Sequence, residues 1–318
     1  MERSGLFQVW KEAFNEEDAY IEFFIKEGVP LGHILSYPPT NANNEAPQAL
    51  LLLLPITCFQ DSIPYPGFYL YALGALRSAR GKGYGKALVK EAEKHAFAVG
   101  KRFVLLQPTN PSLHKFYSTC GYKHNIIRSF LNCSRASLSV ASKEREQLFH
   151  LLSQMSALTA PSEAKNLVTY NLHTQPHCTA PMSPAANSST PFSHFVWSPA
   201  LLEYIQKECL FRGGTIIEHS ATGIAYCYPT EEKNDLYLEI KEFRSSPIQI
   251  PVLVSQILSQ FPHINRFRFY GIPFAAPVME QWFYQPPATE PFALLRFLDP
   301  NLQQRYNSHQ AYFALGLD

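Results

Sequence analysis

The amino-acid sequence predicts an α/β protein whose second half repeats the architecture of the first. Across residues 68–107, an apolar strand, an amphipathic helix and another apolar strand follow one another, which is typical of a βαβ unit with parallel strands. The order helix, three meandering strands, helix, strand occurs in each half, which indicates a structural duplication. With 318 residues, 46% of them hydrophobic, the chain is long enough for two cores.

The first half is expected to begin with helices and to continue as a β-meander. Apolar residues recur at helical spacing from Leu6 to Phe14 and from Tyr20 to Phe24, with a polar break between them. Apolar runs bounded by turn residues then predict strands, and two amphipathic stretches predict helices. The expected strands are 31–37, 49–59, 68–76, 103–107 and 125–133, and the expected helices are about 86–96 and 112–119.

The second half begins with a helical stretch at 142–155, followed by a segment of different composition. Ser, Thr, Pro, Ala and Asn dominate residues 156–194, which we expect to be a linker or a long surface insertion. The pattern then predicts helices at 197–209 and 250–261 and strands at 214–218, 223–229, 236–243, 266–270, 293–298 and 312–317. We therefore expect two domains, 1–138 and 139–318.

Composition argues against several classes of protein. The formal net charge is +1, so a broad nucleic-acid surface is not expected. The longest apolar run, Ala49–Leu54, is far shorter than the roughly 20 residues of a membrane span, and no signal peptide is recognised. Six scattered cysteines form no CxxC pair, which predicts no metal site and a cytoplasmic location.

The sharpest chemical signal is the pattern Arg80-x-x-Gly83-x-Gly85 at a predicted strand-to-helix junction. Glycines allow the backbone to approach a ligand, and free N–H groups at a helix start bind anions, so a pyrophosphate is the natural ligand. The alternative is a Gly-rich turn with solvated lysines. The residues expected to form this anion site are Arg80, Gly81, Lys82, Gly83, Tyr84, Gly85 and Lys86.

A second pattern, Asn110-x6-Tyr117-x3-Gly121-Tyr122, follows about 30 residues downstream. Together the two patterns resemble those of the GNAT superfamily of N-acetyltransferases, over roughly residues 6–130. The resemblance implies an N-terminal catalytic domain of the GNAT fold that binds acetyl-coenzyme A as co-substrate and uses no metal. The implied coenzyme contacts are the backbone of Ala75, Leu76 and Arg77, the residues of the anion site, and Asn110 near the pantetheine. Tyr117 is implied to stand near the thioester sulfur as the acid that protonates the departing thiolate.

The layout is most similar to the enhanced-intracellular-survival group of that superfamily, whose members start with a Trp/Phe-rich helix, here with Trp10 and Phe14. That group carries a degenerate second GNAT-like domain. Here no Gly pair follows Phe243, so we expect the second domain to bind no coenzyme A. In that group the terminal carboxylate enters the active site, which implies the same role for Asp318; the alternative is an edge strand with a solvated end.

The function implied is transfer of an acetyl group to a primary amine by direct attack, without a covalent enzyme intermediate. The amine must lose a proton, and His33, Asp61 and His114 are candidate bases by position alone. The partners would be acetyl-coenzyme A and a small-molecule or peptide amine, with no nucleic acid and no membrane. Three points stay open: transfer to a hydroxyl or of a longer acyl chain, acyl-coenzyme A binding without turnover, and a homo-oligomeric state.

Overall fold

In the computed structural model, the described residues are 3–39, 46–60, 63–140, 193–219, 223–232, 235–245, 250–271, 286–306 and 311–313. The helix expected at 142–155 and most of the segment 156–194 lie outside them, as do Asp61 and Asp318. The chain divides into two compact units, each built from separate stretches of sequence. The first contains residues 1–128, 184–208 and 291–318, and the second contains 129–183 and 209–290.

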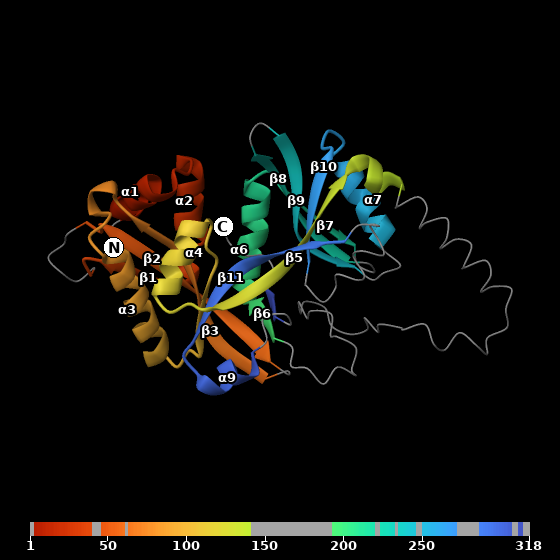
Figure 1. The fold of residues 1–318 in the computed structure, drawn as a ribbon. Coiled ribbons are helices and arrows are strands. Elements are labelled where there is room, and N and C mark those ends of the chain that lie inside the picture. Colours follow the sequence, from red (N-terminus) through yellow and green to blue (C-terminus); the bar gives the residue numbers. More distant parts are fainter. Residues whose placement is uncertain are drawn as a thin grey trace. The chain divides into compact units, whose positions relative to one another are not determined.

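The first half of the chain forms the elements that its sequence predicts (Figure 1). They are α1 (Arg3–Phe14), α2 (Asp18–Glu27), η1 (Val29–Leu31), β1 (His33–Tyr37), β2 (Ala49–Gln60), β3 (Ile63–Ala75), η2 (Arg77–Ala79), α3 (Tyr84–Ala98), β4 (Phe103–Leu106), α4 (Pro111–Thr119) and β5 (His124–Ser134). β2 and β3 are antiparallel, whereas β3 and β4 are parallel, so the βαβ prediction is confirmed.

Strands from the second half complete the sheet of the first unit. In that unit the order is β12-β6-β2-β3-β4-β11-β5, with β1 also paired to β2. Three of these strands come from the second half, namely β6 (Ser193–Trp197), β11 (Ala288–Phe297) and β12 (Ala311–Phe313). β11 is antiparallel to β4, and β6 is antiparallel to β2. Residues 193 and 194, which the sequence assigns to the insertion, therefore belong to a strand.

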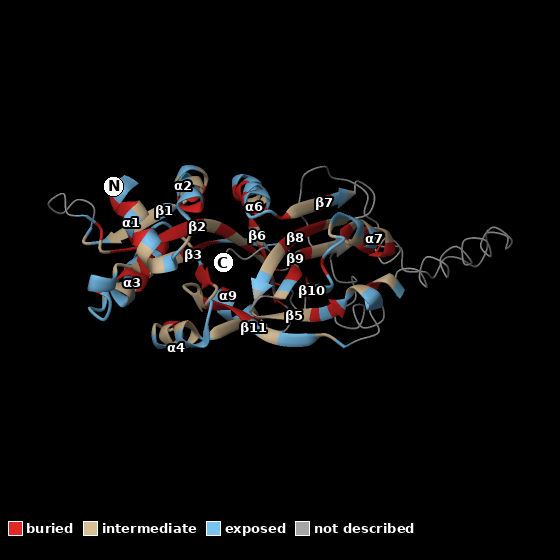
Figure 2. Ribbon diagram, turned by 90° about the horizontal axis from the view of Figure 1, so that it is seen from above, coloured by how far each residue is buried: buried red, intermediate tan, exposed pale blue. Residues whose placement is uncertain are grey.

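The core of the first unit lies between this sheet and its helices (Figure 2). Every residue from Ala49 to Leu54 is almost fully buried, as expected for a strand covered on both faces. α3 contributes the buried residues Leu88, Val89, Ala92 and Ala96. β4 is buried throughout. This packing fixes the two helices that follow the parallel strands.

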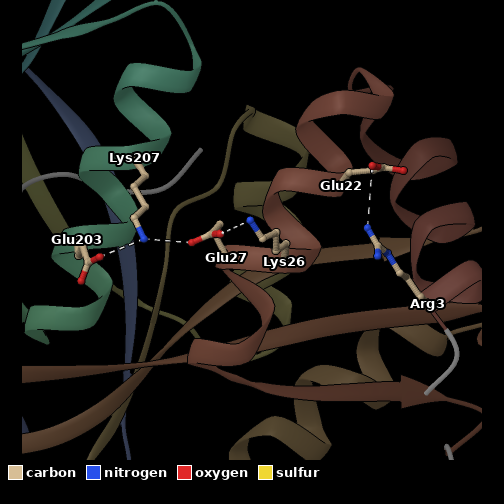
Figure 3. Close-up of polar contacts among 6 residues, drawn as sticks. All are labelled: Arg3, Glu22, Lys26, Glu27, Glu203 and Lys207. Atoms are coloured by element: carbon tan, nitrogen blue, oxygen red, sulfur yellow. Dashed lines mark hydrogen bonds and ion pairs between the residues drawn. The ribbon is translucent and has the colours of Figure 1, made fainter.

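The helix α6 (Pro199–Phe211) joins the first unit through residues up to Glu208, where it meets α2. The ring of Tyr204 lies 5.8 Å from that of Phe23 and 6.1 Å from that of Phe24. At the surface, Lys207 pairs with Glu27 at 3.1 Å and with Glu203 at 3.0 Å (Figure 3). A short helix, α9 (Pro300–Arg305), follows β11 and is capped by Asp299.

The second unit has a sheet in the order β5-β10-β9-β8-β7. Its further elements are β7 (Thr215–His219), β8 (Gly223–Glu232), β9 (Asp235–Ser245), α7 (Ile250–Gln260) and β10 (Arg266–Gly271). Phe267 and Phe269 lie in the core, while Arg268 lies on the other face and donates to Asn132. The strand expected at 266–270 is thus confirmed. No helix in the described part of the chain is long and apolar enough to cross a membrane.

Candidate functional site

The candidate site lies where β3 and β4 separate. Their parallel pairing covers Phe68 opposite Val104 and Tyr69 opposite Leu105, although β3 continues to Ala75. Within that continuation β3 has a β-bulge, because the register with β2 shifts between Leu50 and Leu52. Backbone groups in such a gap are available to a ligand, and bulges are frequent beside active sites.

In this bulge two residues of β3, Ala72 and Leu73, face the single residue Leu51 of β2. Ala72 has a φ of 54°. A left-handed conformation costs a non-glycine residue on the order of 1 kcal/mol, so the surrounding structure must impose it. The sequence did not indicate this residue, since Tyr71-Ala72-Leu73-Gly74 continues an ordinary apolar strand pattern. The small side chain of Ala72, between larger apolar residues and shortly before the glycine turn, was the one feature of the sequence that could have indicated the bulge.

The turn after β3 is anchored to the end of α1. The Arg77 N–H donates to the Glu12 carboxylate at 3.0 Å, and Arg80 Nη2 donates to the Glu12 carbonyl at 3.1 Å. Leu76 N–H donates to the Gln48 carbonyl at 2.9 Å. The guanidinium of Arg80 thus holds the turn in place, and the N–H groups of Leu76 and Arg77 already have partners within the protein.

The glycines of the next turn are shaped for a ligand. Gly81 has a φ of 77° and Gly83 a φ of 84°, a region that L side chains rarely adopt, and nothing lies within 4 Å of where a Cβ would stand. Gly83 is the N-cap of α3, and no side chain caps that helix start. Its first N–H groups are therefore not capped by a side chain, and two exposed lysines, Lys82 and Lys86, lie in the same segment. This is the geometry of an anion cradle, consisting of residues 81–86.

Gly85 and Tyr84, the other two uncharged residues of the cradle, pack against neighbouring side chains. Gly85 is helical, and an added Cβ would stand 3.7 Å from both Leu73 and Phe116, an ordinary contact distance. Tyr84 stacks on Tyr37, with ring centroids 4.1 Å apart. The cradle thus begins beside a partly exposed aromatic pair.

Asn110 is the N-cap of α4. Its Oδ1 accepts from the N–H of Leu113 at 3.0 Å and from the hydroxyl of Ser112 at 2.6 Å. The side-chain oxygen therefore fixes the start of α4, which is an ordinary structural role for Asn in this position. The residue is exposed, so its amide group stays accessible to a ligand.

Tyr117 is the buried residue of α4, only 6% exposed. Its ring lies 5.1 Å from Phe116 and 6.0 Å from Tyr122. Burial raises the pKa of its hydroxyl well above the usual value, and the nearby Cys120 thiol adds to this rise. Tyr117 thus presents a protonated hydroxyl at neutral pH.

The candidate bases lie in different places. His33 is exposed on β1 and stacks on His95 near the far end of α3, at 4.1 Å between ring centroids. His114 lies one turn before Tyr117 on α4, and its Nε2 is shielded from solvent without a hydrogen-bond partner. Asp61 and the terminal Asp318 are outside the described residues. Of the histidines, His114 is the one on the helix that carries Tyr117.

Comparison with known proteins agrees with this geometry. The family model described as "Acetyltransferase (GNAT) family" matches residues 2–122, which span α1, the cradle and Tyr117. This part of the chain is a GNAT acetyltransferase domain. The family named from the sequence patterns is thereby confirmed. No curated protein sequence matches the chain.

Solved structures extend the similarity to nearly the whole chain. A GCN5-related N-acetyltransferase from Kribbella flavida has a TM-score of 0.59 at 13% identity, covering 94% of this chain and 71% of that one. A probable N-acyltransferase from Enterococcus faecalis V583 has 0.59 at 14%, covering 96% and 73%. Eis1 from Mycobacterium abscessus has 0.55 at 13%, covering 94% and 72%. These similarities show that this GNAT domain is part of a fold shared with the enhanced-intracellular-survival group.

Proposed function

We propose that the protein is an acetyl-coenzyme A-dependent N-acetyltransferase that acts on a primary amine. The observation that carries this proposal is the uncapped start of α3, with left-handed Gly81 and Gly83, directly after the bulged end of β3. The family supplies acyl transfer as the general reaction. The donor, the acceptor class and the roles of individual residues are the substance of the proposal.

The cradle would hold the pyrophosphate of the donor. Backbone N–H groups of residues 81–86 and the positive end of α3 supply the attraction, and Lys82 and Lys86 add charge. Both lysines are exposed beside the cradle. The gap after Tyr69 between β3 and β4 would then take the pantetheine, with the backbone near Ala75 beside it.

At the thioester, a backbone N–H group of the bulged part of β3 would donate a hydrogen bond to the carbonyl oxygen. The Tyr117 hydroxyl would donate a hydrogen bond to the sulfur. The amine nitrogen attacks the carbonyl carbon, the carbon–sulfur bond breaks, and the thiolate leaves. An ordinary tyrosine has a pKa of about 10 and a thiol one of about 8.5, so full proton transfer from the tyrosine to the thiolate costs roughly 2 kcal/mol of free energy. Burial makes full transfer still less favourable. Tyr117 therefore acts mainly by donating a hydrogen bond to the departing sulfur.

The amine must transfer a proton to a base, and we propose two candidates for that base, His114 and the terminal carboxylate of Asp318. His114 Nε2 is unpartnered and one turn from Tyr117. The terminal carboxylate of Asp318 stays a prediction from the family resemblance. Two separate variants distinguish them: His114→Gln and a chain without Asp318. Only loss of the true base should change the acidic limb of the pH–rate profile.

The test is release of free thiol from acetyl-coenzyme A in the presence of a panel of primary amines. Wild type is compared with Gly83→Glu, which puts a carboxylate in the cradle, and with Gly100→Glu at the other end of α3. Gly100 has the same left-handed backbone (φ 75°) and open surroundings, so the two variants are matched in strain and charge. We expect turnover in wild type and Gly100→Glu and none in Gly83→Glu.

Binding without turnover is the second candidate function, and it has its own outcome. If the folded protein binds acetyl-coenzyme A but releases no thiol with any amine, the site is a binding module. If thiol is released with hydroxyl acceptors or only from a longer acyl donor, the cradle assignment holds and the acceptor or acyl assignment is wrong.

A further inference from the structure

One side chain from the second half of the sequence joins the cradle helix to the helix that carries Tyr117. Arg296 lies on β11 opposite Val104 of β4. Its Nη1 donates to the carbonyl of Cys120, the C-cap of α4, at 2.5 Å. The same nitrogen lies 3.1 Å from the Glu93 carboxylate on α3. A single guanidinium thus connects both functional helices of the first unit.

The surroundings of this guanidinium are built to hold it. The Glu93 side chain is only 12% exposed, and burial raises the pKa of its carboxyl while Arg296 and Lys90 act in the opposite direction. Gly121 has a φ of 98°, and an added Cβ would stand 2.5 Å from Arg296 Nη1. The glycine of the Tyr117-x3-Gly121 pattern therefore makes room for Arg296 as well as ending the helix.

The position of α4 depends on its two ends, because the helix is short. It spans Pro111–Thr119, and Tyr117 is its only buried residue. Asn110 fixes its start, and Arg296 contacts its last turn. A cation at a helix C-terminus also complements the negative end of the helix dipole. Removing Arg296 would leave the end nearest Tyr117 without this polar contact to α3.

We infer that Arg296 is a positioning residue, which sets the Tyr117 hydroxyl relative to the coenzyme held at α3. The inference rests on the proposed function, since it takes the Tyr117 hydroxyl as the group that assists the departing sulfur. It follows that residues 2–122 alone do not contain the full catalytic arrangement. A strand from the second half supplies part of it.

The kinetic test is a double-mutant cycle of Arg296→Gln and Tyr117→Phe in the full chain. We expect Arg296→Gln to lower kcat about 10-fold while KM for acetyl-coenzyme A changes less than about 2-fold, because the cradle is untouched. In the Tyr117→Phe background, Arg296→Gln should have no further effect on kcat. Multiplicative effects would overturn the inference, and so would an unchanged kcat in Arg296→Gln.

A matched control comes from the second unit. Arg135 also donates to carbonyls at a helix end, namely that of Leu258 in the last turn of α7 at 3.2 Å and those of Phe261 and Ile264 (2.8 Å) after it. Arg135→Gln removes the same kind of contact away from the cradle. We expect it to lower the unfolding temperature and to leave kcat unchanged. Should Arg296→Gln fail to fold, Arg296→Lys retains the charge without the paired geometry and should lower kcat about 3-fold.

A readout without turnover separates this inference from the proposed function. Tyrosines labelled with ¹³C at Cζ give one signal per residue, and the Tyr117 signal is the one missing in Tyr117→Phe. We expect this signal to shift in Arg296→Gln and to stay in place in Arg135→Gln. If Tyr117→Phe leaves kcat unchanged, the role proposed for Tyr117 is wrong, and the shift still tests the positioning by Arg296. An unmoved signal in Arg296→Gln would contradict the inference.

Discussion

The two units share a bulged strand before their central helices and differ in the turn that connects this strand to the helix. In the first unit β3 is parallel to β4 and bulged near Ala72. In the second unit β9 is parallel to β10, and its register with β8 shifts in the same sense, with Lys241 as the extra residue. The duplicated bulge supports the structural duplication that the sequence predicts.

The connecting turns differ in length and in glycine content. In the first unit residues 76–83 lie between β3 and α3 and include left-handed Gly81 and Gly83. In the second, only Ser246–Gln249 lie between β9 and α7, and they contain no glycine. The bulge is therefore common to both units, whereas the left-handed glycines proposed to bind an anion belong to the first. The proposal of one coenzyme site per chain, in the first unit, rests on this difference.

The largest effect should come from separating the halves. Residues 1–138 produced alone lack β6, β10, β11 and β12, so β2 and β4 each lose a neighbour and β5 loses both of its neighbours. We expect this fragment to be unfolded or aggregated, with no binding of acetyl-coenzyme A. Circular dichroism and size-exclusion chromatography would show it. A monomeric, cooperatively folding fragment with full affinity would mean that the exchanged strands are dispensable.

Next in size is Tyr117→Phe, which should lower kcat on the order of 10²-fold with KM for acetyl-coenzyme A nearly unchanged. Because the pKa of Tyr117 is raised, its hydroxyl stays protonated at least to about pH 10. Wild-type kcat should therefore show no loss from Tyr117 ionisation up to that pH. An unaltered rate in the Phe variant would assign Tyr117 to packing alone.

Sequence reasoning located the elements and the cradle but not their connections. Helices and strands of the first half follow from local periodicity, and the glycines at positions 81 and 83 from the turn pattern. Periodicity carries no information about which sheet a strand joins, so the exchange of β6 and β11 was not predicted. Nor was the anchoring of Arg80 to Glu12, because it depends on where α1 ends in space.

A smaller effect concerns pH and the exchanged strand β6. Burial lowers the pKa of His194 to about 4, and its ring stacks on Phe59 of β2 at 5.1 Å. In the unfolded chain His194 is protonated near its ordinary pKa of 6.5. The stability contributed by its neutral ring is therefore complete above pH 6.5 and is lost as the pH falls from about 6.5 to 4. His194→Phe should reduce the fall of the urea midpoint across this range. An identical fall in both proteins would contradict the assignment.

The smallest effect should come from the surface network of Lys26, Glu27, Lys207 and Glu203 (Figure 3). Exposed ion pairs contribute little to stability, although Lys207 lowers the pKa of Glu27 here. Lys207→Met should leave the unfolding temperature and acetyl-coenzyme A binding unchanged within error. A clear loss of either would show that α6 depends on this network rather than on Tyr204.

We propose one donor site per chain, formed by the glycine turn of the first unit. Calorimetric titration of the full chain with acetyl-coenzyme A tests it most directly, with Gly83→Glu and Gly100→Glu as the matched pair. We expect saturation at one molecule per chain, kept in Gly100→Glu and abolished in Gly83→Glu. Two molecules per chain, or equal affinity in both variants, would contradict it.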